Sequence, residues 1–169
     1  LNLGGNFMAD HNVTAFTQFV STQPAWGTSG DGFGRDAVMK FHFDIGAIAT
    51  ELGDTLTTND TVTFWHIPIG TEIRKVLLVV KTAPTATTCA LLVGDGDTLG
   101  TATQDDGYLQ HIDMSAAGVI HGSETSGDHY ASVGGRLYSS ASHLMLSFAT
   151  AAPTGAIFDL YVLCTFIDI

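Results

Sequence analysis

The side chains in this sequence that could do chemistry are its 7 histidines, 17 carboxylates and 2 cysteines. None of them stands in a catalytic motif, because the sequence has no Gly-x-Ser-x-Gly elbow, no phosphate-binding glycine loop and no His-Glu-x-x-His. The adjacent carboxylates Asp105 and Asp106 come closest to an acid–base pair, but the glycine after them is typical of a solvated turn. We therefore expect no enzymatic activity and no catalytic residue.

The histidines are spaced too widely to predict a metal site. No two of them stand two or four residues apart, the spacings that place ligands on one face of a strand or helix. His42 and His111 each stand two residues before an aspartate, which predicts hydrogen-bonded surface pairs. Residues 95–100 begin like a calcium loop, but Leu99 stands where an oxygen ligand is required, so we expect a turn. We expect no metal and no cofactor.

The two cysteines and two tryptophans have simple structural interpretations. Cys89 and Cys164 lie in apolar, strand-like runs, which predicts buried free thiols. Trp65 lies between Phe64 and His66 in another such run and fits a core or a subunit interface. Trp26 and Trp65 together could instead form a sugar-stacking platform, as in carbohydrate-binding sandwiches.

The charge of the chain excludes two classes of partner. Six cations stand against 17 carboxylates, a formal net charge of −11, and no basic cluster exceeds the pair Arg74–Lys75. Phosphate backbones and anionic membranes both require a basic surface, so we expect neither nucleic acid nor membrane as partner. Hydrophobic residues make up 45% and charged residues 14% of the chain, which indicates apolar surface that an oligomer or a docking partner must cover.

Seven to nine short strands must position these side chains. Residues 38–45 alternate between apolar and polar, the pattern of a half-buried strand, whereas 72–82 and 157–169 are apolar on both faces. Turn residues separate these segments at roughly even intervals, with one helical turn expected around 115–117. The other predicted strands are 61–67, 87–93, 108–113 and 144–150. This series predicts an all-β fold, an antiparallel β-sandwich or barrel.

Residues 1–36 have a different composition from residues 37–169. They are rich in Gly, Asn, Ser and Thr and carry five scattered aromatics, which predicts an extended N-terminal arm beside a β-sandwich domain. We expect the arm to bind a partner through four of the aromatics: Phe16, Phe19, Trp26 and Phe33. The sequence begins at Leu1 with a methionine at position 8, which fits either proteolytic trimming or a start at Met8.

Four short motifs in order resemble a known group of proteins. They are Ile67-Pro68-Ile69-Gly70-Thr71, Val93-Gly94-Asp95-Gly96, Asp106-Gly107-Tyr108-Leu109 and Gly134-Gly135-Arg136-Leu137-Tyr138. This order is similar to that of small bacteriophage virion structural proteins, the head decoration or cement proteins, over residues 37–169. The resemblance implies a jelly-roll-like sandwich, often trimeric, on the outside of a phage head, and it implies no catalytic residues.

The expected function is therefore structural. We expect a capsid decoration protein, made in the host bacterial cytoplasm, that binds the major capsid protein on the outer surface of the virion and stabilises the shell. We expect a homotrimer, because Val76–Val80 and Tyr161–Ile167 are apolar on both faces and one sandwich core covers only one of them. A tail, fibre or adaptor protein with the same sandwich, or a carbohydrate- or receptor-binding module, is the alternative.

Overall fold

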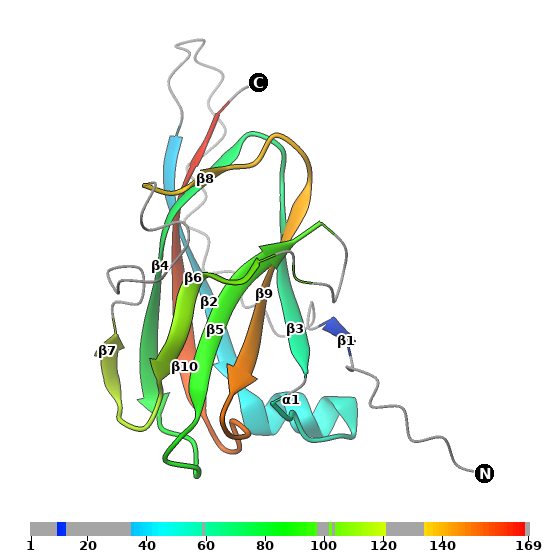
Figure 1. Ribbon diagram of the computed structural model, residues 1–169, viewed down its shortest axis with the longest axis vertical. Coiled ribbons are helices and arrows are strands. Elements are labelled where there is room, and N and C mark those ends of the chain that lie inside the picture. Colours follow the sequence, from blue (N-terminus) through cyan, green and yellow to red (C-terminus); the bar gives the residue numbers. More distant parts are fainter. Residues whose placement is uncertain are drawn as a thin grey trace, which may run out of the picture.

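Two β-sheets pack face to face in this chain, with one short helix beside their lower end (Figure 1). The computed structural model describes residues 10–12, 35–58, 60–97, 102, 104–120 and 134–167. Sheet A has the order β1 (Asp10–Asn12), β3 (Thr61–Ile67), β9 (Ser142–Ala149), β5 (Ala90–Gly96) and β6 (Gln104–Asp113). Sheet B has the order β2 (Arg35–Asp44), β10 (Ile157–Phe166), β4 (Thr71–Thr82) and β7 (Gly118–Ile120), and β8 (Arg136–Leu137) also pairs with β4.

The strand order identifies the type of sandwich. The last strand, β10, lies between β2 and β4, and β9 lies between β3 and β5, so the chain repeatedly crosses from one sheet to the other. The eight strands 2-10-4-7 and 3-9-5-6 have the arrangement of a jelly roll. All pairings between them are antiparallel. The predicted all-β, jelly-roll-like antiparallel sandwich is thus confirmed.

Aromatic side chains fill the middle of the core between the sheets. Phe43 of β2 stacks on Phe158 of β10 with ring centroids 4.9 Å apart, and Phe41 meets Phe64 of β3 edge to face at 5.0 Å. All four rings are at most 2% exposed. Each fully buried side chain of this size contributes about 1.5–3 kcal/mol to folding. The alternation predicted for residues 38–45 is therefore confirmed, with Phe41 and Phe43 on the inward face.

The helix α1 (Ile45–Leu52) is absent from the elements predicted above. The Asp44 side chain caps it by accepting a hydrogen bond from the Ala47 backbone N–H at 3.1 Å, and Gly53 ends it in the left-handed conformation at φ 68°. Ile45 and Ile48 bury one face of the helix under the core. Both end signals are visible in the sequence, but the helix has only eight residues and directly follows a strand.

Two strands of sheet A run further than predicted. β5 continues through Asp95 to Gly96, so Asp95 lies in a strand and not in a turn. β6 begins at Gln104, which places Asp105 and Asp106 in a strand as well, where Asp106 accepts a hydrogen bond from Gln110 at 2.8 Å. The β5–β6 pairing has two register shifts, so strict alternation is lost there and the pattern of period two is hidden.

The first described residues join the edge of sheet A. Asp10–Asn12 form β1 and pair in parallel with Thr61–Thr63 of β3. Sheet B begins at Arg35, close to the predicted start of the sandwich domain at residue 37. Within the described residues, no helix has the length and hydrophobicity to cross a membrane.

Candidate functional site

Among the described residues, two aspartates are fully buried, one in each sheet: Asp95 in β5 and Asp159 in β10. A carboxylate buried without a partner would be strongly unfavourable, and it is retained as a charge only where cations and hydrogen bonds surround it. Both aspartates have such partners. Each of them is the centre of a polar network. The network of Asp159 lies on the side of sheet B that points away from the core, which is the third feature described below.

The first network joins Asp95 to two tyrosines through one arginine. Arg136 Nη1 lies 2.7 Å from Asp95 Oδ2, and its guanidinium lies over the ring of Tyr138 at 4.9 Å. The hydroxyls of Tyr138 and Tyr108 are 2.8 Å apart. Burial, together with the neighbouring Tyr108 and Asp95, raises the pKa of Tyr138 far above its usual value, so this side chain stays a neutral phenol.

This network brings together the four motifs that carry the resemblance. Asp95, Tyr108 and the pair Arg136 and Tyr138 each come from a different motif, and the fourth is joined through the backbone. The Gly70 N–H donates to the Tyr138 carbonyl at 2.8 Å, and the Tyr138 N–H donates to the Thr71 carbonyl at 2.9 Å. The four motifs thus form one cluster that ties β8 to both sheets.

Glycine is required where β8 approaches β4. Gly135 has φ 119°, and a Cβ at this position would lie 2.6 Å from the Ile73 carbonyl oxygen. This close approach keeps β8 against β4. On β8, Arg136 points inward and Leu137 points outward. Leu137 is 50% exposed, and Ile69, in the turn that contacts Tyr138 through Gly70, is 57% exposed.

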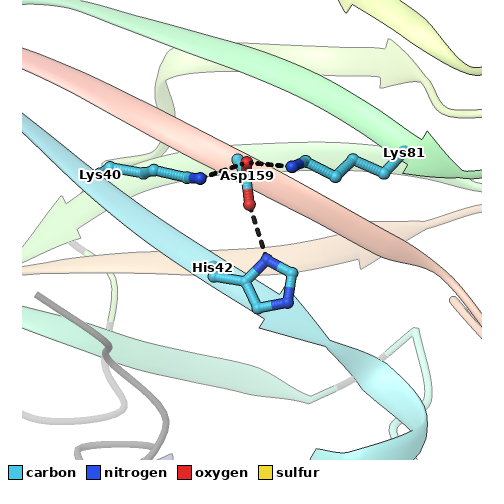
Figure 2. A network of polar contacts seen from close by, with 4 residues as sticks. All are labelled: Lys40, His42, Lys81 and Asp159. Carbon is cyan, nitrogen blue, oxygen red and sulfur yellow. Dashed lines mark hydrogen bonds and ion pairs between the residues drawn. The ribbon is translucent and has the colours of Figure 1, made fainter. Parts of the chain in front are cut away.

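The second network surrounds Asp159 and joins three strands of sheet B (Figure 2). Lys40 Nζ and Lys81 Nζ lie 2.9 and 3.0 Å from Asp159 Oδ2, and His42 Nδ1 lies 2.7 Å from Oδ1. Burial alone would raise the pKa of Asp159. The hydrogen bonds from His42, Lys40 and Lys81 outweigh burial and lower that pKa below its ordinary 3.8. The carboxylate is therefore negatively charged at neutral pH and fastens β2 and β4 to β10.

The histidine–aspartate pairs predicted from spacing are wrong. His42 bonds to Asp159 on the neighbouring strand, while Asp44 caps α1. Asp113 accepts bonds from the backbone and hydroxyl of Ser115, at 2.8 and 2.9 Å. Nothing near His42 in the sequence indicates its partner, which is 117 residues away. The sequence signal that could have identified the two networks is a single aspartate within an otherwise apolar strand, as at Asp95 and Asp159.

The side of sheet B that points away from the core is half exposed, and its residues form rungs across β2, β10 and β4. We call it the outer face of sheet B. Its four rungs are Asp36–Thr165–Glu72, Val38–Leu163–Lys75, Lys40–Tyr161–Leu77 and His42–Asp159–Val79, with Arg74 and Lys81 beside them. Val38 is 54% exposed, and Leu77, Val79, Tyr161 and Leu163 are partly exposed. The outward positions of β4 and β10 are therefore mixed, with four apolar side chains between charged and polar ones, whereas the core covers the inward positions.

The remaining candidate residues are placed as follows. Phe16, Phe19, Trp26 and Phe33 lie outside the described residues. Trp65 is 8% exposed and packs beside Phe41 at 5.9 Å, in the core. In the described part of the chain, no three His, Cys, Asp or Glu side chains are grouped so that they could hold a metal ion.

The cysteines behave as predicted. Cys89 and Cys164 are both free and buried. Burial is the main reason that the pKa of each thiol rises to about 11, with smaller contributions from Asp113 and Asp36 respectively. These are packing residues with little nucleophilic character.

Comparison with known proteins finds similar structures but no matching sequence. No family model and no curated protein matches the sequence. A chain in the capsid of Helicobacter pylori bacteriophage KHP30 is 17% identical, with 79% of this chain and 90% of that chain covered and a TM-score of 0.49. A chain of the cyanophage Pam1 capsid is 16% identical, with 88% and 96% covered and a TM-score of 0.48. A chain in the capsid of Ralstonia phage GP4 is 14% identical, with 83% and 90% covered and a TM-score of 0.50. At this level of similarity, the protein shares its β-sandwich fold with a chain of the GP4 phage capsid.

Proposed function

We propose that this protein is a structural component of a bacteriophage virion, and specifically a decoration protein on the outer surface of the head. The observation that supports this most is the jelly-roll fold shared with a chain of the Ralstonia phage GP4 capsid. The order of the four motifs, which meet in the Asp95 network, points to the same class of protein. The protein would be made in the host cytoplasm and then bind the major capsid protein, stabilising the shell without chemistry.

The buried polar groups are consistent with a structural role. Asp95 is paired with Arg136 of the opposite sheet, and Asp159 is paired with Lys40 and Lys81 of the two strands beside it. A general base or a nucleophile must reach a substrate, whereas these carboxylates face protein groups. Their contribution is to fasten strands together.

The proposed binding mode has two parts. The arm lies before β2 and anchors to the major capsid protein through Phe16, Phe19, Trp26 and Phe33. The sandwich extends from Arg35 and includes β1 at the edge of sheet A. The sandwich associates into a homotrimer, since the outer face of sheet B leaves apolar side chains partly exposed. Three arms on one trimer would bind with far higher avidity than a single arm.

Reconstitution on particles tests this function. Purified protein is added to phage heads that lack it, and the decorated particles are imaged by electron cryo-microscopy. We expect density at regular positions over the outer surface of the head and a higher temperature of capsid disruption. Density restricted to the tail, at low copy number, would show instead that the chain is a tail or adaptor protein.

A further inference from the structure

Two histidines form a pair on the side of sheet A that points away from the core. His66 of β3 and His143 of β9 are directly opposite each other in the antiparallel pairing of these adjacent strands (Figure 1). Their ring centroids are 4.9 Å apart, and the rings meet edge to face at 79°. The two residues are far apart in the sequence, so the spacing of histidines along the chain could not predict the pair.

The sheet holds both histidines in place. Their neighbours in the chain, which are Trp65, Ile67, Ser142 and Leu144, are at most 8% exposed. Because side chains alternate along a strand, these buried neighbours anchor the backbone and leave both imidazoles on the outward side. Directly opposed residues have Cβ atoms about 4.5–5.5 Å apart. The pair is therefore preorganised by two regular strands.

The pair can be reached from solution. β1 covers the edge of β3 only along Thr61–Thr63, so no described strand lies beside His66, which is exposed. On the other side of His143, which is partly exposed, the opposite residue in β5 is Gly96. Because glycine has no side chain, this rung of sheet A presents the two imidazoles and nothing else across β3, β9 and β5.

The separation of the two rings suits one shared metal ion. A metal such as zinc binds an imidazole nitrogen at about 2.0–2.1 Å, which places the ion about 3.2 Å from the ring centroid. Two such bonds at about 90–110° to each other put the centroids about 4.5–5.2 Å apart. The observed separation of 4.9 Å lies within this range.

The rings can aim their nitrogens at such an ion by turning about their Cβ–Cγ bonds. This rotation leaves the centroids almost unmoved, because the bond points at the centre of the ring, and its torsion is soft. His143 Nδ1 is buried and has no hydrogen-bond partner among the described residues, so turning this ring breaks no hydrogen bond at that atom. The exposed ring of His66 has room to turn.

We propose that His66 and His143 form a binding site for one transition-metal cation, with water in the other coordination positions. Imidazole nitrogens suit Zn²⁺, Ni²⁺ and Cu²⁺, whereas Ca²⁺ and Mg²⁺ prefer oxygen ligands. The affinity should be highest for Cu²⁺, as it is for most sites with nitrogen ligands. The bound ion joins β3 to β9 through their side chains, and the site does not depend on the proposed role on the phage head.

Calorimetric titration with Ni²⁺ tests the proposal, on the full chain without a polyhistidine tag. We expect His66→Asn and His143→Asn each to weaken binding of Ni²⁺ by at least about tenfold, since each removes one of two ligands. Zn²⁺ should compete with Ni²⁺ for the site, and Ca²⁺ should not. His111→Asn is the matched control and should bind like the parent. His111 is an exposed histidine of β6 with φ 51°, a conformation that asparagine tolerates.

A second measurement uses the parent protein alone, in case His143→Asn fails to fold. In NMR spectra, a small amount of paramagnetic Cu²⁺ should broaden the imidazole signals of His66 and His143 before those of His42 and His111. Thermal unfolding verifies the fold of each variant, and Ni²⁺ should raise the melting temperature of the parent more than that of His66→Asn.

Four outcomes would overturn the proposal: no binding by the parent at about 1 mM Ni²⁺, unchanged affinity in His66→Asn, an equal loss in His111→Asn, or broadening by Cu²⁺ that begins at other histidines. Because metal binding is measured without phage particles, each of these outcomes leaves the decoration function untouched. A protein that binds Ni²⁺ as proposed but fails to bind heads would contradict the decoration function and leave this site intact.

Discussion

Arg136 and Asp95 belong to different sheets, and their side chains meet at 2.7 Å across the upper end of the sandwich. Arg136 lies on β8, which pairs with β4 of sheet B, whereas Asp95 lies on β5 of sheet A. The Tyr108–Tyr138 hydrogen bond makes a second link between the same two sheets. This end of the sandwich is therefore closed by polar contacts in addition to apolar packing.

Removal of Arg136 should destabilise the fold strongly. Arg136→Met leaves the fully buried Asp95 without its cation, and we expect a loss of about 3–5 kcal/mol in the free energy of unfolding, measured with urea. The double variant Arg136→Met/Asp95→Asn should recover part of the loss. Arg74→Met is the control, since its ion pairs are exposed and contribute less than about 1 kcal/mol. Equal losses at positions 74 and 136 would contradict this account.

The Asp159 network should make the free energy of unfolding depend on pH in the acid range. The pKa of Asp159 is lowered by folding, so its contribution is fully present above the unfolded value of 3.8 and is lost as the pH falls through the folded value. Asp159→Asn should lower the unfolding free energy at pH 7 by about 1.5–3 kcal/mol, because Lys40 and Lys81 can still reach water.

The pH profile separates this effect from a general loss of packing. Unfolding measured from pH 7 down to pH 2 should show a difference between parent and Asp159→Asn that shrinks in the acid range. Asp54→Asn, at an exposed loop position, serves as the control and should follow the parent. A constant difference at every pH would show that the charge of Asp159 is not responsible.

Adjacent glycines should respond differently to alanine. Gly135→Ala places a Cβ against the Ile73 carbonyl oxygen and must displace β8 from β4. A Cβ at position 134 would have no atom within 4 Å, so Gly134→Ala should lower the free energy of unfolding by only about 1–2 kcal/mol, because of the left-handed φ of 80° at this position. Thermal unfolding of both variants should show clearly the larger loss for Gly135→Ala. If the two losses are the same, the contact with β4 does not require glycine.

The two thiols should be inert in the native protein. Cys89 and Cys164 are buried, and each has a pKa raised to about 11, so almost no thiolate forms at pH 8. A thiol reagent such as dithionitrobenzoate should react with neither in native protein and with both after denaturation in guanidinium. Fast reaction of either cysteine in the native state would show that its strand opens readily.

Deletion of the arm should separate attachment from folding. Asp36 bonds to Thr165 and Arg74, so the deletion should end at residue 34 and keep β2 complete. We expect the truncated protein to keep its β-sheet circular dichroism and to lose binding to heads. Phe16→Ala, Phe19→Ala and Trp26→Ala should each weaken binding without unfolding. Unfolding of the truncated protein would move the domain boundary, and undiminished binding would place the contact on the sandwich.

The sequence predicts the strands better than the polar networks, for a physical reason. Alternation in residues 38–45 reports local burial, so the strand with Phe41 and Phe43 can be found from a few neighbouring residues. The partners of Asp159 lie on three strands, and no local pattern encodes which strands will be adjacent. The helix α1 was missed although Asp44 and Gly53 mark its ends, because eight residues between strands give little periodicity.

The short strand β1 has a consequence for the behaviour of the protein in solution. A sheet edge with free backbone N–H and C=O groups recruits strands from other molecules and promotes aggregation. Asp10–Asn12 occupy that edge along Thr61–Thr63 of β3. A chain cleaved after residue 12, or truncated for the attachment experiment, uncovers this ladder. The strand β1 thus protects this edge of sheet A from association with other chains. Truncated protein should be kept dilute and tested for time-dependent turbidity.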